Sequence, residues 1–208
     1  VKTVQTYYIN FINKWPKIQN LNEASEDDIL KEWSGLGYYR RALNLKKCAE
    51  IICENYNGKF PDSEKELLNL PGIGSYTAAA IISIAFNKPA IVIDGNIQRI
   101  TSRLYEIKED IKKSKSKIYG KLENFCSKKR PGDFAQALMD LGSTICKPVN
   151  PKCNSCPLLK YCLSHKNNTY KFIPLRTKKL NKVLKKGYLY IGITTEEKII
   201  LIKRPKKG

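Results

Sequence analysis

Four cysteines lie close together near the end of the chain, with the spacing C-x6-C-x2-C-x5-C. They are Cys146, Cys153, Cys156 and Cys162. Thiolates at such spacings wrap one metal centre, either a tetrahedral zinc ion or an iron–sulfur cluster. A structural zinc site usually has two close cysteine pairs, whereas here only Cys153 and Cys156 form one, so the spacing favours iron–sulfur. The alternative, two disulfides, is typical of small secreted scaffolds, and 208 residues are long for one.

The balance of charge indicates a polyanionic partner. The chain has 38 Lys and Arg against 19 Asp and Glu, a formal net charge of +19. This excess indicates either nucleic acid or an anionic membrane. No apolar stretch reaches membrane-spanning length and no signal peptide is visible, so we expect nucleic acid and no membrane. The sequence starts without a methionine, inside an amphipathic pattern, so we expect a longer natural chain, and N-terminal targeting stays open.

Apolar periodicity predicts an all-α domain at residues 1–165. Helices are expected at residues 25–33, 39–56, 61–70, 75–86, 94–105, 116–127 and 132–146. Residues 166–186 contain no Asp or Glu and are expected to form a basic linker. Residues 187–208 carry two strand patterns, Tyr188–Ile193 and Ile199–Lys203, and are expected to begin a β-containing domain.

The motif Leu70-Pro71-Gly72-Ile73-Gly74 joins two of the predicted helices. Its glycines allow a sharp turn and expose successive backbone N–H groups near the positive end of the next helix. That arrangement suits a DNA phosphate, with Gly72, Ile73 and Gly74 as the binding residues. Alone, the motif is also compatible with an ordinary helix–helix turn, and it is the charge and the cysteines that favour DNA.

Asp94 precedes a predicted helix in the motif Asp94-Gly95-Asn96-Ile97-Gln98-Arg99. An Asp at this place is most simply an N-cap. A carboxylate held at a helix start is also suited to stabilise the positive charge that develops on a sugar during glycosidic cleavage. The two roles are compatible with each other.

The segment Trp33-Ser34-Gly35-Leu36-Gly37-Tyr38-Tyr39-Arg40-Arg41 combines aromatic residues, glycines and arginines. Such a combination fits a wedge that enters a base stack, flanked by phosphate contacts. It is equally compatible with a pair of core tyrosines after a helix-ending glycine. Tyr38 and Arg41 are the candidates for DNA contact.

Taken in order, these motifs resemble those of the helix-hairpin-helix DNA glycosylases of the endonuclease III superfamily. The resemblance rests on G-L-G-Y-Y, L-P-G-I-G, D-G-N-I-Q-R, M-D-L-G-S-T-I-C and the spaced cysteines. It extends from Val1 to about Tyr170 and is closest to the adenine DNA glycosylases, the MutY type. It implies an all-α helix-hairpin-helix glycosylase fold with an iron–sulfur cluster loop, followed by the truncated start of a β-containing Nudix-like domain.

The resemblance also implies a reaction. The family removes adenine mispaired with 8-oxoguanine or guanine, after the base has flipped out of double-stranded DNA. Asp94 would stabilise the sugar cation, with Asn96 as a supporting group, and Tyr38 would be wedged beside the lesion base. The four cysteines would hold a [4Fe-4S] cluster, which shapes a DNA-contacting loop through Lys147 and Lys152.

Tyr76 separates two branches of the superfamily. The endonuclease III-like enzymes carry a lysine at this place that forms a Schiff base with the sugar and cuts the strand, which a tyrosine cannot do. The resemblance therefore implies a monofunctional glycosylase. The family's adenine-protonating glutamate lies in an E-x-M-L-Q-Q-T stretch before the position of Val1, and no residue in Val1–Asn10 replaces it. We therefore expect residues 1–208 alone to be impaired in catalysis.

Two other classes of protein stay open. One is a bifunctional endonuclease III-like glycosylase and AP lyase, against which Tyr76 argues. The other is a non-catalytic iron–sulfur or zinc DNA-binding module, which the absent glutamate leaves open. For the glycosylase we expect a monomer in the bacterial cytoplasm, associated with the nucleoid.

Overall fold

The computed structural model describes residues 2–177, 186–188 and 190–201. Contacts between residues divide the chain into two units, Val1–Arg176 and Thr177–Gly208. The division falls inside the predicted linker 166–186, so the first part of that segment packs with the helical unit. Ile173 is 3% exposed, which is the burial of a core residue.

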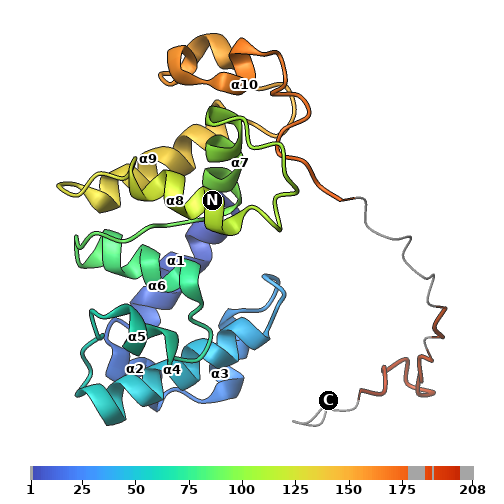
Figure 1. The fold of residues 1–208 in the computed structure, drawn as a ribbon. Helices are drawn as coiled ribbons and strands as arrows, with labels where there is room; N and C mark the ends of the chain where they lie inside the picture. Colours follow the sequence, from blue (N-terminus) through green and yellow to red (C-terminus); the bar gives the residue numbers. More distant parts are fainter. Residues whose placement is uncertain (1, 178–185, 189, 202–208) are drawn as a thin grey trace. The chain divides into compact units, whose positions relative to one another are not determined.

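The first unit is helical, as the sequence predicts, and its described residues contain no β-strand (Figure 1). The α-helices are α1 (Lys2–Lys14), α2 (Ile18–Glu23), α3 (Glu26–Glu32), α4 (Arg40–Tyr56), α5 (Glu64–Leu68), α6 (Ser75–Ala80), α7 (Gly95–Leu104), α8 (Lys115–Glu123), α9 (Pro131–Thr144) and α10 (Leu163–Lys166). A π-helical segment, η1 (Ile81–Ala85), continues α6. Two short 3-10 turns, η2 (Cys153–Ser155) and η3 (Leu159–Tyr161), lie in the cysteine-rich segment.

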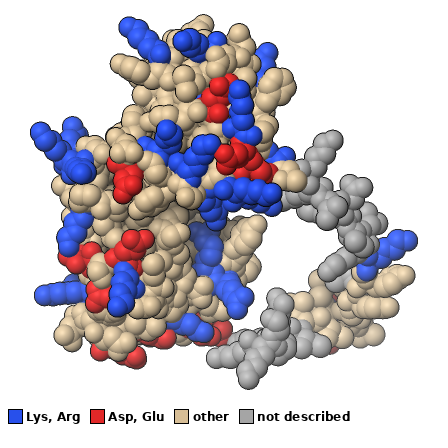
Figure 2. All heavy atoms as spheres, in the orientation of Figure 1, with Lys and Arg blue, Asp and Glu red and all other residues tan. Residues whose placement is uncertain are grey.

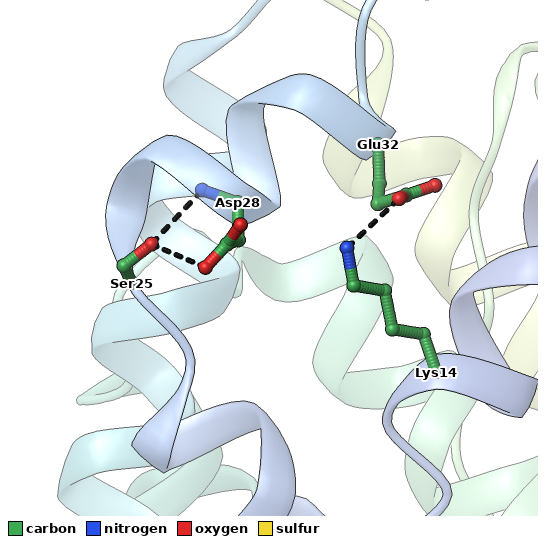
Figure 3. A network of polar contacts seen from close by, with 4 residues as sticks. All are labelled: Lys14, Ser25, Asp28 and Glu32. Atoms are coloured by element: carbon green, nitrogen blue, oxygen red, sulfur yellow. Dashed lines mark hydrogen bonds and ion pairs between the residues drawn. The ribbon is translucent and has the colours of Figure 1, made fainter.

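Local side-chain chemistry sets the beginning of α3 (Figure 3). The hydroxyl of Ser25 accepts a hydrogen bond from the backbone N–H of Asp28 at 3.1 Å and donates to the Asp28 carboxylate at 2.6 Å. A side-chain oxygen at this position satisfies a helix N–H that has no partner within the helix. At the other end of α3, Glu32 pairs with Lys14 of α1 at 2.9 Å, which ties the first helix to the third (Figure 3).

Two hydrophobic clusters form the core of this unit. The first joins α4, α5 and α6 through Cys48, Ile52, Leu67, Leu70, Ala78 and Ile82. The second packs α7, α8 and α9 through Val92, Ile97, Ile100, Ile107, Ile118, Leu122, Ala135, Leu138 and Leu141, together with Ala79. The segment α6–η1 contributes to both, and Figure 1 shows α6 between the α4–α5 pair and the α7–α9 group.

The helix predicted for residues 75–86 changes character halfway. It is α-helical to Ala80 and π-helical from Ile81 to Ala85. The beginning of α9 packs tightly on this π segment, because a Cβ on Gly132 would lie 2.6 Å from the carbonyl oxygen of Ser83. A glycine is therefore required at this contact between α9 and η1.

The strands expected after residue 187 are not formed among the described residues. Ile193 and Ile199 make an isolated antiparallel bridge, closed by a hydrogen bond of 2.8 Å from the Thr194 N–H to the Lys198 carbonyl. Ile193 ends the first strand pattern and Ile199 begins the second, so this bridge is the one pair formed between the two patterns among the described residues. An isolated hairpin is marginal without further strands or a hydrophobic partner. Leu189 in the first pattern, and Ile202 and Lys203 in the second, lie outside the described residues.

Candidate active site

Asp94 lies immediately before α7, and two hydrogen bonds fix its carboxylate. Oδ1 accepts from the backbone N–H of Ile97 at 2.7 Å, which makes Asp94 the N-cap of the helix. Oδ2 accepts from the side-chain amide of Asn96 at 3.0 Å. Each carboxylate oxygen has a second lone pair, so the half-buried group can cap the helix and still face a reacting sugar.

Asn96 is held in turn by Arg99. The Asn96 Oδ1 accepts from Arg99 Nη2 at 2.9 Å, and the same guanidinium donates to the carbonyls of Gly142 at 2.7 Å and Cys146 at 2.8 Å. Burial lowers the pKa of Arg99 from its ordinary value, while Cys146 and Asp94 act in the opposite direction. Arginine remains charged even so. A continuous chain of hydrogen bonds therefore connects Asp94 to the first cysteine.

Arg103, one turn further along α7, fixes the cysteine segment itself. Its side chain is 3% exposed, and Nη1 donates to the Lys147 carbonyl at 2.7 Å and lies 3.4 Å from the Cys146 sulfur. Nη2 donates to Pro148 O at 3.1 Å, and Nε donates to Ile173 O at 2.8 Å. One buried arginine thus joins α7 to the chain just after the first cysteine and to the chain beyond the last one.

The close approach of α9 to the start of α7 depends on Gly142. A Cβ at this position would lie 2.5 Å from the Cβ of Asn96, well inside van der Waals contact. The absence of a side chain lets the Gly142 carbonyl reach Arg99. Gly142 therefore sets how close Asn96 lies to the helix that leads into the cysteines.

The four cysteines line one small cavity. Its other walls include Arg103, His165 and Tyr170, and the rings of His165 and Tyr170 stack with centroids 5.7 Å apart. No disulfide joins any of the cysteines, all of which the structure describes, so two disulfides are not formed here. Among the described residues, no group of three His, Cys, Asp or Glu side chains is arranged to hold a single metal ion.

The thiols share an electrostatic environment. Burial raises the pKa of Cys153, Cys156 and Cys162, and the charge of Cys146 acts in the same direction on each of them. Arg103 opposes this effect at Cys153. Thiolates at this spacing repel one another, so a positive centre among them is favoured.

The predicted hairpin connects α5 to α6, as expected. Gly72 has φ +81°, a left-handed conformation that favours glycine, and a Cβ there would lie 2.9 Å from the Cβ of Asn44 in α4. The Ile73 N–H donates to Leu70 O at 3.2 Å, and Gly74 is the N-cap of α6. The turn therefore packs against α4 and leaves the Gly72 and Gly74 backbone exposed.

Tyr76 lies in the first turn of α6 and is 44% exposed. Its hydroxyl lies 3.7 Å from the sulfur of Met139 in α9. The side chain therefore spans from the hairpin helix to α9, with part of the ring open to solvent. No residue in α6 carries an amine, since its sequence is SYTAAA.

The segment Gly35–Tyr39, which we call the wedge loop, links α3 to α4. Gly35, Gly37 and Tyr38 have φ values of +94°, +68° and +49°. The left-handed region is uncommon for a side chain as bulky as that of tyrosine. Tyr38 is nevertheless 83% exposed, so the loop holds a large aromatic ring away from the body of the protein.

The basic candidates differ in their surroundings. The Arg41 guanidinium lies 5.4 Å from the centre of the Trp33 ring, a cation–π arrangement. Lys147 is half-buried and its carbonyl is bound by Arg103, whereas Lys152 is exposed. Figure 2 shows lysines and arginines spread over one face of the molecule, with acidic side chains between them.

The site residues expected from the sequence fall into two groups. Asp94 and Asn96 are joined to the cysteine segment by hydrogen bonds. The hairpin and the wedge loop belong to the part of the unit built on α4. Sequence reasoning assigned no role to Arg99 or Arg103, which lie one turn apart on α7 and are both buried.

A family model described as HhH-GPD superfamily base excision DNA repair protein matches residues 1–128. The chain therefore belongs to the HhH-GPD superfamily of base excision DNA repair proteins. The matched region includes the hairpin, Tyr76 and Asp94, and it ends before the cysteines.

Curated relatives are adenine DNA glycosylases. The one from Buchnera aphidicola subsp. Baizongia pistaciae is 40% identical over 208 residues, which is 100% of this chain and 59% of that protein. The one from Homo sapiens is 39% identical over 165 residues, covering 78% of this chain and 30% of that protein. The chain thus spans less than two thirds of the length of these relatives.

Solved structures share the fold. A thermostable thymine-DNA glycosylase superposes with a TM-score of 0.71 at 30% identity, covering 79% of this chain and 76% of that one. A non-covalent endonuclease III–DNA complex superposes with a TM-score of 0.68 at 26% identity, covering 80% of this chain and 78% of that one. In the part of the chain that the structure describes, no helix has the length and hydropathy needed to cross a bilayer.

Proposed function

We propose that this chain is the glycosylase part of an adenine DNA glycosylase, which hydrolyses the N-glycosidic bond of adenine mispaired with 8-oxoguanine or guanine. The observation that carries the proposal is the 40% identity over all 208 residues to a curated protein of that activity. The fixed carboxylate of Asp94 supports it, because glycosidic cleavage develops positive charge on the sugar. The partner is double-stranded DNA that contains the mismatch.

In this proposal, Asp94 stabilises the sugar cation and Asn96 holds the carboxylate in place. The carboxylate acts mainly in the transition state, since its charge interacts weakly with a neutral sugar and strongly with an oxocarbenium ion. Tyr76 cannot form a Schiff base, so water attacks the sugar and the enzyme is monofunctional.

DNA is held by two features of the α4 part. The hairpin Gly72-Ile73-Gly74, in which the two glycines are exposed, binds a phosphate, and Tyr38 enters the base stack beside the lesion. Arg41 lies next to the wedge loop and contributes positive charge there. Lys147 and Lys152 contact the DNA backbone from the cysteine loop.

The four cysteines are proposed to hold a [4Fe-4S] cluster. A tetrahedral zinc ion with Zn–S bonds of about 2.3 Å would bring its sulfurs to about 3.8 Å from one another. A [4Fe-4S] cluster is larger than a single ion, and four thiols lining one cavity suit such a centre. Arg103 beside Cys146 suits a site that concentrates negative charge. The bound cluster supplies a rigid cross-link for the loop that carries Lys147 and Lys152.

The proton that adenine needs before it leaves has no donor in the first helix. The segment Lys2–Lys14 contains no Asp or Glu, so no carboxylic acid of α1 serves as the general acid. We therefore propose that residues 1–208 bind the mismatch but release adenine slowly.

The proposed organisation is a glycosylase domain at residues 1–165, a basic linker at 166–186 and the start of a Nudix-like domain at 187–208. We also propose that the protein acts as a monomer in the bacterial cytoplasm, associated with the nucleoid.

Single-turnover excision by the full-length gene product tests the proposal. Duplexes carrying adenine opposite 8-oxoguanine, adenine opposite guanine, thymine opposite guanine, or an oxidised pyrimidine are compared under the same conditions. We expect release from the two adenine substrates, without strand cleavage. Release of thymine or oxidised pyrimidine instead, or release of no base at all, would refute it.

A further inference from the structure

The conformation of the wedge loop around Tyr38 needs support from other parts of the protein. Three of its residues lie in the left-handed region, and only two of them are glycines. The next helix begins one residue after the loop, with the Arg41 N–H donating to the Tyr38 carbonyl at 2.8 Å. The exposed ring of Tyr38 has no protein surface to rest on, so its direction depends on how the loop backbone is fixed.

Trp33 provides that fixing contact. Its indole Nε1–H donates to the carbonyl oxygen of Gly37 at 3.0 Å. This carbonyl belongs to the peptide unit that leads directly into Tyr38, so the bond sets the orientation of that peptide. On the other side of the loop, the Arg41 guanidinium lies over the same indole ring. Trp33 thus contacts the residues before and after the tyrosine.

The indole of Trp33 is itself packed against α1. The ring of Phe11 meets Trp33 edge-on with centroids 6.3 Å apart, in the geometry that aromatic pairs prefer. Tyr7 lies against the other end of the wedge loop, since a Cβ on Gly35 would be 2.6 Å from its hydroxyl. The first helix therefore supports the loop through aromatic contacts to Trp33 and to Gly35.

We propose that Trp33 is a positioning residue for mismatch recognition: it holds the wedge loop in the conformation that directs Tyr38 into the base stack. This inference rests on the proposed function. Trp33 is half-buried beneath the loop, so it acts through Tyr38. These contacts are made without DNA, and preorganisation of this kind increases affinity because binding then has less of the loop to order.

The test compares two tryptophan-to-phenylalanine variants of the full chain. Trp33→Phe keeps an aromatic ring for Phe11 and Arg41 but removes the indole donor to Gly37. Trp15→Phe is the matched control, because Trp15 also packs on Phe11, at 4.6 Å, and lies outside the wedge loop contacts. We expect Trp33→Phe to lower the ratio of mismatch to matched-duplex affinity by about three- to tenfold, the effect of one hydrogen bond. Trp15→Phe should leave the ratio unchanged.

A double-mutant cycle with Tyr38→Ala tests separately whether Trp33 acts through Tyr38 and whether Tyr38 itself recognises the mismatch. If Trp33 acts through Tyr38, Trp33→Phe will change the ratio in the Tyr38 protein and will change it little in the Tyr38→Ala protein. Equal effects in both backgrounds would overturn the positioning role. If Tyr38→Ala alone leaves the ratio unchanged, the wedge function itself is wrong, and the proposed recognition fails for that separate reason.

Tryptophan fluorescence gives a further test, because Trp33 emission should not respond to mismatch DNA if Trp33 only stabilises the fold. Residues 1–208 contain two tryptophans, so in a protein of these residues Trp15→Phe leaves Trp33 as the one emitter and Trp33→Phe leaves Trp15. We expect the emission of Trp33 to change on addition of mismatch DNA and to change less with Tyr38→Ala. A mismatch-induced change confined to Trp15 would overturn the proposal.

Discussion

Arg99 donates a hydrogen bond of 2.8 Å to the carbonyl oxygen of Cys146, 47 residues further along the chain. The same guanidinium holds Asn96, which in turn holds the Asp94 carboxylate. The candidate catalytic group and the candidate cluster ligand are therefore parts of one hydrogen-bonded structure.

Asp94→Asn is expected to reduce adenine excision by a few hundredfold or more while leaving mismatch affinity nearly unchanged. Removing a charge that acts on the transition state commonly costs about 3–4 kcal/mol. The cap itself should survive, because Asn caps a helix about as well as Asp. Single-turnover rates and binding isotherms of the full-length protein check this. An unchanged rate would mean that Asp94 serves only as the helix cap.

Arg99→Lys should impair both stability and excision. A lysine cannot reach Asn96, Gly142 and Cys146 together, so buried carbonyls lose their partner and the free energy of unfolding falls by about 2–3 kcal/mol. Asn96 is released as well, so the excision rate should fall further than DNA affinity does.

Arg103→Lys is the matched control for that variant. It loosens the cysteine segment through Lys147, Pro148 and Ile173 but leaves the bond between Arg99 and Asn96 in place. Its stability should fall by a similar amount, whereas its excision rate at equal iron content should fall less. Equal losses of excision rate in the two variants would show that the hydrogen bonds from Arg99 through Asn96 to Asp94 do not position the carboxylate.

Gly142→Ala and Gly120→Ala should have opposite effects. An added Cβ at Gly142 meets Asn96 at 2.5 Å, and overpacking of this kind costs about 1–3 kcal/mol. A Cβ at Gly120 in α8 meets nothing within 4 Å, so alanine there should stabilise by about 0.4–1 kcal/mol. Thermal unfolding measures both. Destabilisation of similar size at both positions would show that the close approach of α9 to Asn96 is not decisive.

Cys153→Ser or Cys156→Ser should remove the iron and lower both folding and DNA affinity, since metal binding and folding are coupled. The native protein purified anaerobically should contain about four irons per chain and absorb visible light. Cys53→Ser, in α4 and away from the cavity, should keep the iron. Stoichiometric zinc without iron in the native protein would sink the cluster assignment.

Borohydride should not trap the native protein on DNA, because α6 offers no amine. Tyr76→Lys places an amine at a 44% exposed position of that helix, and we expect a covalent complex to appear. Tyr76→Phe, which keeps the ring, should not be trapped. A covalent complex with the native protein would instead favour a bifunctional lyase.

The sequence predicted those features that local chemistry controls. Ser25 caps α3 and Asp94 caps α7 because the partner N–H lies three residues away in each case. The all-α fold follows from apolar periodicity, and membership of the helix-hairpin-helix superfamily is confirmed.

Contacts between distant segments could not be read in the same way. The sequence pattern predicted no role for Arg99 and Arg103, since their partners lie more than 40 residues away. The hydrogen bond from Arg103 to the Ile173 carbonyl is equally hidden, so the sequence did not show that the first residues of the predicted linker pack with the helical unit. The roles of the site residues stay predictions.

In α7, Arg99 and Arg103 donate hydrogen bonds to the backbone carbonyls of residues 146–148 in the cysteine segment. Just after the helix, Glu106 accepts hydrogen bonds from Thr169 at 2.8 Å and Asn167 at 2.7 Å. We therefore expect α7 and the cysteine segment to change together in evolution. If loss of the cysteines let this segment move, the two buried arginines would lose the backbone carbonyls of residues 146–148, and these arginines would have to change too. Related sequences that lack the four cysteines are therefore expected to lack the equivalents of Arg99 and Arg103 as well.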